Sequence, residues 1–310
     1  MSQAAKHRLV IAVAVGVGAW VWLVALPCLV APDGSTGLSL LGASGGAVRA
    51  WATALAAAAP SLALALVVAA TGHPANGVLC ASASLCIAAA RGGSIEGWWL
   101  RMEPGEGYLG LIGEVLMWQV ILAMLIALIV VLRPKLRLGL AWLAVAVPDY
   151  DDRDSRLLHP HTWFATLASA AGAALLGWLL IPTGDVATSD TAQVIVGLII
   201  SFTLATLIAQ LFLSQAGPYG MFFSPAILAI AVYAYVYFKF DNSAALLSAW
   251  QDVTLRTSQR LPGLAMALPI HYASAGVLGT ALGIAWARTL MVSEDQAQDT
   301  SDPDIADARS

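Results

Sequence analysis

Long runs of apolar residues, separated by short polar or Pro- and Gly-containing stretches, dominate the chain between residues 9 and 288. Most of these runs exceed the roughly 20 residues that a helix needs to cross the ~30 Å hydrocarbon core of a bilayer. The pattern predicts an all-α polytopic membrane protein, a bundle of about eight transmembrane helices. The expected spans are 9–31, 50–71, 75–91, 108–132, 161–182, 191–214, 217–238 and 262–288.

Three segments differ from ordinary spans. Segment 75–91 is short and contains two serines, which predicts a tilted or half-buried helix in the bundle interior. Segment 138–147 is apolar but too short to cross, and it predicts a re-entrant or interfacial piece on the inner side. Segment 243–260 places its apolar and polar residues mainly on opposite helical faces, so we expect a helix on the outer leaflet.

Composition excludes a soluble fold. Of the 310 residues, 59% are hydrophobic and 11% are charged, whereas an ordinary globular chain is about 25% charged. The chain also lacks the basic surface of a nucleic-acid-binding protein. The last stretch is acidic and has little apolar surface to bury, so we expect a single transmembrane domain over 1–292 and a disordered cytoplasmic tail over 293–310.

The basic residues favour a cytoplasmic N-terminus by the positive-inside rule. The first apolar run is longer than the 7–15 residues of a signal-peptide core, which predicts an uncleaved first span. Eight spans then put both termini in the cytoplasm of a bacterial-type inner membrane, unless 138–147 also crosses. The expected inner cations are Lys6, Arg8, Arg133, Lys135, Arg137, Arg153, Arg156 and Arg288, and the outer ones are Arg49, Arg91, Arg101, Lys239, Arg256 and Arg260.

Polar residues inside two spans favour a transport function. Glu114 is the only carboxylate well inside an apolar span, and an ionisable group in the membrane is costly enough to indicate function. Span 191–214 carries a polar face with a spacing of three or four residues. The two spans together predict a substrate path. The alternative is structural: Ser and Thr bond to their own helix, and Gln210 links neighbouring helices. The polar face consists of Thr203, Thr206, Gln210 and Ser214.

The last span carries a row of small residues, Ala275, Gly279, Gly283 and Ala287, spaced by four. Such a row lets two helix backbones approach closely in lipid. We expect a tight helix pair within the chain, and the alternative is a homodimer through this span.

A serine and a histidine suggest a further hypothesis. Ser44 lies in the sequence Gly42-Ala43-Ser44-Gly45, and His271 begins the small-residue row. Together with Trp99-Leu100-Arg101, this arrangement resembles the rhomboid intramembrane proteases and implies a serine hydrolase. The order differs, because in rhomboids the Trp-Arg loop precedes the serine. The spacing differs as well, and no family is assigned.

A metal site would draw on the loop before span 161–182. Asp151, His159 and His161 offer one carboxylate and two imidazoles there, whereas a solvated loop with Asp capping the next helix is the favoured interpretation. The spacing is not that of an EF-hand, and we expect no cofactor.

Three functional classes remain: a transport or translocation component, a non-catalytic scaffold subunit of a larger membrane complex, and the serine hydrolase. We favour transport, expect no enzyme activity, and expect the lipid bilayer and other membrane subunits as partners.

Overall fold

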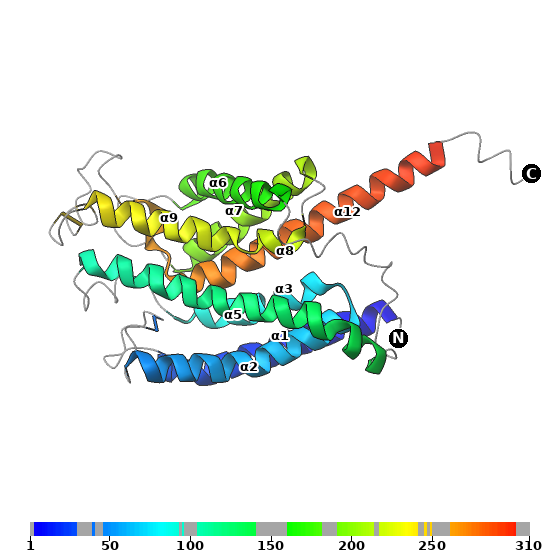
Figure 1. The fold of residues 1–310 in the computed structure, drawn as a ribbon, viewed down its shortest axis with the longest axis horizontal. Coiled ribbons are helices and arrows are strands. Elements are labelled where there is room, and N and C mark those ends of the chain that lie inside the picture. Colours follow the sequence, from blue (N-terminus) through cyan, green and yellow to red (C-terminus); the bar gives the residue numbers. More distant parts are fainter. Residues whose placement is uncertain are drawn as a thin grey trace, which may run out of the picture.

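The structure is a computed structural model of the 310-residue chain. It describes residues 3–29, 39–40, 46–92, 95, 104–140, 160–181, 191–213, 217–240, 245–246, 249 and 261–301 (Figure 1). Within this part all regular structure is helical, and seven helices are long and apolar enough to cross a membrane. The prediction of an all-α polytopic membrane protein is therefore confirmed.

Each predicted span corresponds to a helical segment of the structure. The elements are α1 (Gln3–Leu29), α2 (Ala47–Thr71), α3 (Pro74–Ala89), α5 (Pro104–Gly139), α6 (Pro160–Leu180), α7 (Thr191–Phe212), α8 (Pro218–Met221), α9 (Ser224–Lys239), η2 (Gly263–Met266), α11 (Pro269–His271), η3 (Tyr272–Gly276) and α12 (Val277–Ser301). α9 reaches a full span together with α8, as the 22-residue segment Pro218–Lys239. Among the described helices that match predicted spans, α3 alone falls short: its 16 residues rise about 24 Å. It is largely buried, as predicted for a helix of the bundle interior.

Successive long helices run in opposite directions along the bundle (Figure 1). The start of α1 and the end of α12 lie at the same end, which we call the terminal end; the opposite end is the far end. Glu114, ten residues after the start of α5, therefore lies in the far half.

The helices form two groups that share one interior. α1, α2 and α3 pack on one another, and α7 packs between α6 and α12. The groups are joined where α5 contacts α2 and α9 and where α3 contacts α12. The largest of three apolar clusters, which contains Trp22, Tyr108, Phe202 and Tyr233, runs through both groups.

Two helices extend past their predicted ends, and two predicted segments lie mostly outside the described residues. α5 continues past 132 to Gly139, so the basic cluster at 133–137 belongs to a helix and the predicted interfacial segment begins inside it. Residues 141–147 and most of 243–260 lie outside the described residues. α12 extends to Ser301, beyond the predicted domain end at 292, and the disordered tail stays a prediction.

Candidate functional site

The last span is an interrupted helix. Pro262 and Pro269 bracket its first part, and a proline cannot donate the backbone hydrogen bond that a continuous helix requires. The chain forms the short η2 turn between them, turns once at α11, and then widens into the π-helical turn η3 before α12 begins. Every residue from Gly263 to Tyr272 is buried. Backbone that departs from α-helix at membrane depth is tolerated only inside the protein or along a cavity.

Three fully buried tyrosines, one each from α5, α9 and η3, bind the carbonyls of this interrupted segment. Their hydroxyls satisfy acceptors that a regular helix would have satisfied with its own N–H groups. The rings of Tyr108 and Tyr272 each contact the ring of Tyr233, with centroids 5.7 and 6.0 Å apart. The donors and acceptors are Tyr108 to Ala265 (3.2 Å), Tyr272 to Leu264 (2.8 Å) and Tyr233 to Ala267.

Glu114 lies next to this tyrosine cluster and is 1% exposed. Its Oε2 accepts hydrogen bonds from the Ser39 hydroxyl (2.7 Å) and the Leu40 N–H (3.1 Å). Its Oε1 accepts a longer bond from the Trp118 indole N–H (3.4 Å). An ionised carboxylate is an acceptor only, and the three donors match that state. Glu114 thus ties the segment that follows α1 to the first third of α5.

His271 caps the helix that follows the interruption. Its Nδ1 accepts the Leu268 N–H at 3.1 Å, so a neutral ring carries its proton on Nε2. That Nε2 is buried and forms no hydrogen bond of normal geometry with the described residues, although the Ala89 carbonyl is nearby. α11, which carries His271, packs on α5, so the structure brings His271 and Glu114 into the same half of the bundle.

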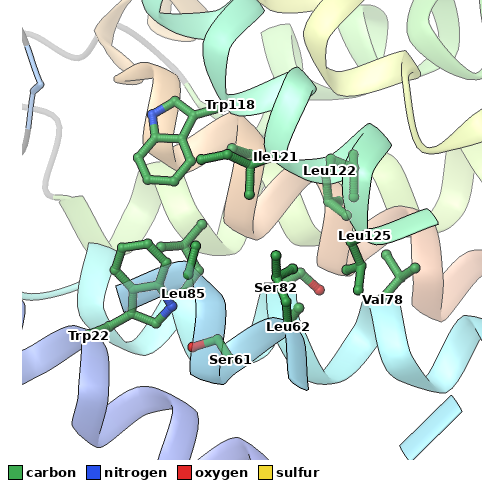
Figure 2. A pocket seen from close by; sticks show the side chains of 14 residues that line it. Trp22, Ser61, Leu62, Val78, Ser82, Leu85, Trp118, Ile121, Leu122 and Leu125 are labelled. Atoms are coloured by element: carbon green, nitrogen blue, oxygen red, sulfur yellow. The ribbon is translucent and has the colours of Figure 1, made fainter. Parts of the chain in front are cut away.

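A small apolar cavity adjoins the cluster between α1, α2, α3 and α5 (Figure 2). Its volume is about 50 Å³. Trp22 and Trp118 face it from opposite helices, with ring centroids 5.9 Å apart. Ser61 and Ser82 line it, but both hydroxyls donate to carbonyls of their own helices. This space suits a short stretch of alkyl chain better than a hydrated ion.

The predicted polar face of α7 lies elsewhere. Thr203 donates to the Gly279 carbonyl (3.2 Å), and Thr206 shares a hydrogen bond with Ser169 (2.8 Å). Gln210 is buried nearer the terminal end, and Ser214 lies outside the described residues. α7 packs on α6 and α12, whereas α5 packs on α2 and α9. None of these residues, nor Glu114, lines the cavity described above.

The small-residue row packs against another helix of the same chain. Ala275 and Ala287 are fully buried. A Cβ at Gly279 would lie 2.5 Å from the Ile199 carbonyl oxygen, and one at Gly283 would lie 2.6 Å from that of Thr203. The row therefore lets α12 touch the backbone of α7, as the favoured interpretation expected, and it offers no free seam to a second copy.

The hydrolase and metal candidates are not brought together within the described residues. Ser44, Asp151 and His159 lie outside them, and His161 is exposed at the start of α6. No group of three or more metal-ligating His, Cys, Asp or Glu side chains occurs in the part of the chain that the structure describes.

Comparison with protein-family models, curated proteins and solved structures gave no match. The function is therefore argued from geometry. The three tyrosines and Trp118 were not anticipated from the sequence; Pro262 and Pro269, seven residues apart at the start of a predicted span, were the available signal of an interruption.

Proposed function

We propose that this chain is a transport component of a bacterial-type cytoplasmic membrane, and that its ligand engages the cluster formed by Glu114, His271 and the interrupted segment 263–276. The observation that supports the proposal is the interruption itself. Discontinuous helices at membrane depth present carbonyls and helix ends to a ligand in many transporters, and here a carboxylate and a buried imidazole N–H lie in the same half of the bundle.

Protonation of Glu114 supplies a coupling step. The ionised carboxylate accepts from Ser39, Leu40 and Trp118 together. Protonation removes the negative charge that strengthens these bonds. A proton on Oε1 would also oppose the Trp118 N–H, which can only donate, whereas the Ser39 hydroxyl can reverse and accept. Proton uptake from the far side thus loosens the 39–40 segment over the cluster, and release restores it. We propose this step in place of the predicted polar path, because Glu114 on α5 and the polar residues of α7 lie in different parts of the bundle.

The distribution of the described cations supports an orientation. Six lie at the terminal end and three at the far end, which favours a cytoplasmic terminal end. The terminal set is Lys6, Arg8, Arg133, Lys135, Arg137 and Arg288, and the far set is Arg49, Arg91 and Lys239.

Reconstituted proton flux tests this function. Purified protein is placed in vesicles containing a pH-sensitive dye, and a potassium diffusion potential is imposed with valinomycin. We expect dye acidification above that of protein-free vesicles, and a loss of at least about tenfold in Glu114→Gln, as for removal of an essential proton carrier. Gln119→Leu, which removes another polar group from α5, is the matched control and should retain the flux.

Equal flux in Glu114→Gln and the wild type, with both folded by size-exclusion chromatography, would refute the coupling role. A wild-type flux no greater than that of empty vesicles would refute a proton path through Glu114.

A scaffold function is the second candidate, because much of the described interior is filled and satisfied within the chain. Ser169 hydrogen-bonds to both Thr206 and Ser224, and so joins α6, α7 and α9. α6 also exposes Trp163, Phe164 and Trp178, a face that suits lipid or another subunit. Purification in mild detergent separates the two functions: a stoichiometric set of co-purifying subunits favours the scaffold.

A further inference from the structure

The turn between α2 and α3, residues 71–74, is covered by side chains from three other helices. Turns at the ends of membrane helices are usually exposed, yet Thr71, Gly72 and Pro74 are buried. α1, α5 and α12 supply the covering side chains His7, Arg133 and Arg288. The terminal end therefore contains a built arrangement of polar groups around one turn.

Arg133 is fixed to the end of α2. Its Nε donates to the Ala69 carbonyl (3.2 Å), and one terminal nitrogen donates to the Gly72 carbonyl (3.4 Å). These are the C-terminal carbonyls of α2, where the helix dipole attracts a cation. The guanidinium is thereby held at the turn, half-buried, rather than free to extend into water.

Arg288 reaches the same turn from α12. Its terminal nitrogen lies 3.5 Å from Nδ1 of His73, which also accepts the Ala75 N–H. Burial, followed by the charges of Arg288 and Arg133, lowers the pKa of His73 to about 3. His73 is therefore neutral at ordinary pH, and the two arginines act on it together from neighbouring helices.

The surroundings add positive charge. Lys135 and Arg137 continue α5 beyond the turn, and Lys6 and Arg8 flank His7 on α1. Among the side chains that the structure describes, the one carboxylate is Glu114, in the far half. The described side chains around the turn are thus cationic, and the acidic residues Glu294, Asp295 and Asp299 follow Arg288 farther along α12.

We propose that Arg133 and Arg288 together bind the phosphate of an anionic phospholipid in the adjacent leaflet. Planar guanidinium groups match phosphate oxygens in pairs, and basic groups between helix ends are recognised sites for lipid headgroups. The same helix provides a place for the acyl chain: Val130, one turn before Arg133 and on the same side of α5, is exposed. A lipid satisfies both features, whereas free phosphate satisfies only the first.

Native mass spectrometry of delipidated protein in detergent tests the proposal. Phosphatidylglycerol, phosphatidylcholine and inorganic phosphate are titrated separately. We expect phosphatidylglycerol to bind at least fivefold more tightly than phosphatidylcholine. Arg288→Gln should weaken phosphatidylglycerol about fivefold, as for one basic side chain at a membrane surface. Arg49→Gln, which removes an exposed arginine at the far end, is the matched control and should bind as the wild type does.

Arg133→Gln is a second variant with the same expected loss, and its melting temperature without lipid shows whether the α2 end remains folded. Arg288→Gln decides the result if Arg133→Gln unfolds, because Arg288 contacts the His73 ring rather than the backbone carbonyls at the end of α2. Equal binding of the two lipids, or equal loss in Arg49→Gln, would overturn the site. Inorganic phosphate that competes fully with phosphatidylglycerol and binds as tightly would overturn the lipid as its source.

Discussion

At the scale of single residues, buried polar groups of this protein work in local sets with matched donors and acceptors. Glu114 meets three donors, and each of three tyrosine hydroxyls meets one carbonyl. A polar group left without its partner in the interior costs about 1–3 kcal/mol. These sets therefore hold particular segments in place, and each supplies a site where one substitution has a defined effect.

His73 should make the fold sensitive to acid. Its pKa is lowered from 6.5 to about 3 in the folded protein, so the unfolded chain binds the proton more readily below pH 6.5. Stability is full above pH 6.5 and falls as the pH drops toward 3, by at most about 1.4 kcal/mol per pH unit. His73→Asn keeps a cap for the Ala75 N–H and removes the titration.

The measurement is the denaturation midpoint in detergent at pH 7.5 and pH 5.0 for both proteins. We expect the wild type to lose more stability on acidification than His73→Asn does, by about 2 kcal/mol. The same loss in both proteins would show that His73 does not carry this sensitivity.

At the scale of elements, α12 packs closely on the backbone of α7, whereas the segment just before α12 departs from regular α-helix. The contrast has a physical reason. Glycines at 279 and 283 let α12 lie against α7 carbonyls, whereas Pro262 and Pro269 prevent a regular helix between them. One predicted span therefore contains an irregular first part and a regular, closely packed α-helix.

Gly283→Ala should destabilise the α7–α12 pair. The added Cβ would lie 2.6 Å from the Thr203 carbonyl oxygen and 2.8 Å from the Thr206 Cβ, and such overpacking costs about 1–3 kcal/mol. Gly113→Ala is the matched control, because nothing lies within 4 Å of its Cβ position. Melting temperatures in detergent should fall for Gly283→Ala and stay level or rise for Gly113→Ala; equal shifts would contradict this packing role.

The sequence was most informative where one residue type had one physical role. Apolar runs located the spans because lipid demands them, and Glu114 was found because a carboxylate in such a run is rare. The tyrosines were missed because Tyr suits both the membrane interface and the interior, and its hydrogen-bond partner depends on packing. Thr203 and Thr206 suggested a path, whereas their hydroxyls bind α12 and α6.

At the scale of the whole molecule, the alternating helices place the start of α1 and the end of α12 together. This arrangement requires that the short α3 still carry the chain from the terminal end toward the far end. Its 16 residues leave a deficit of about 6 Å against the hydrocarbon core, and the surrounding longer helices cover the difference.

Impermeant thiol labelling checks this topology. In a variant whose three cysteines are replaced by alanine, single cysteines are introduced as Gln3→Cys and Ser310→Cys. Both should react only after the cells are permeabilised, because we expect both termini in the cytoplasm. Val48→Cys, at an exposed position of the far end, should react in intact cells. Opposite sidedness of the two terminal cysteines would reject the even number of crossings.

The three tyrosine hydroxyls that hold the interrupted segment also limit how often it opens. If each bond contributes a net 0.5–1.5 kcal/mol, about the usual range, then releasing all three costs roughly 1.5–4.5 kcal/mol. An unaided open conformer would be occupied by between about one molecule in ten and one in two thousand. Under the transport function proposed above, turnover would thus be slow at rest and rise steeply with any ligand that captures the rare conformer.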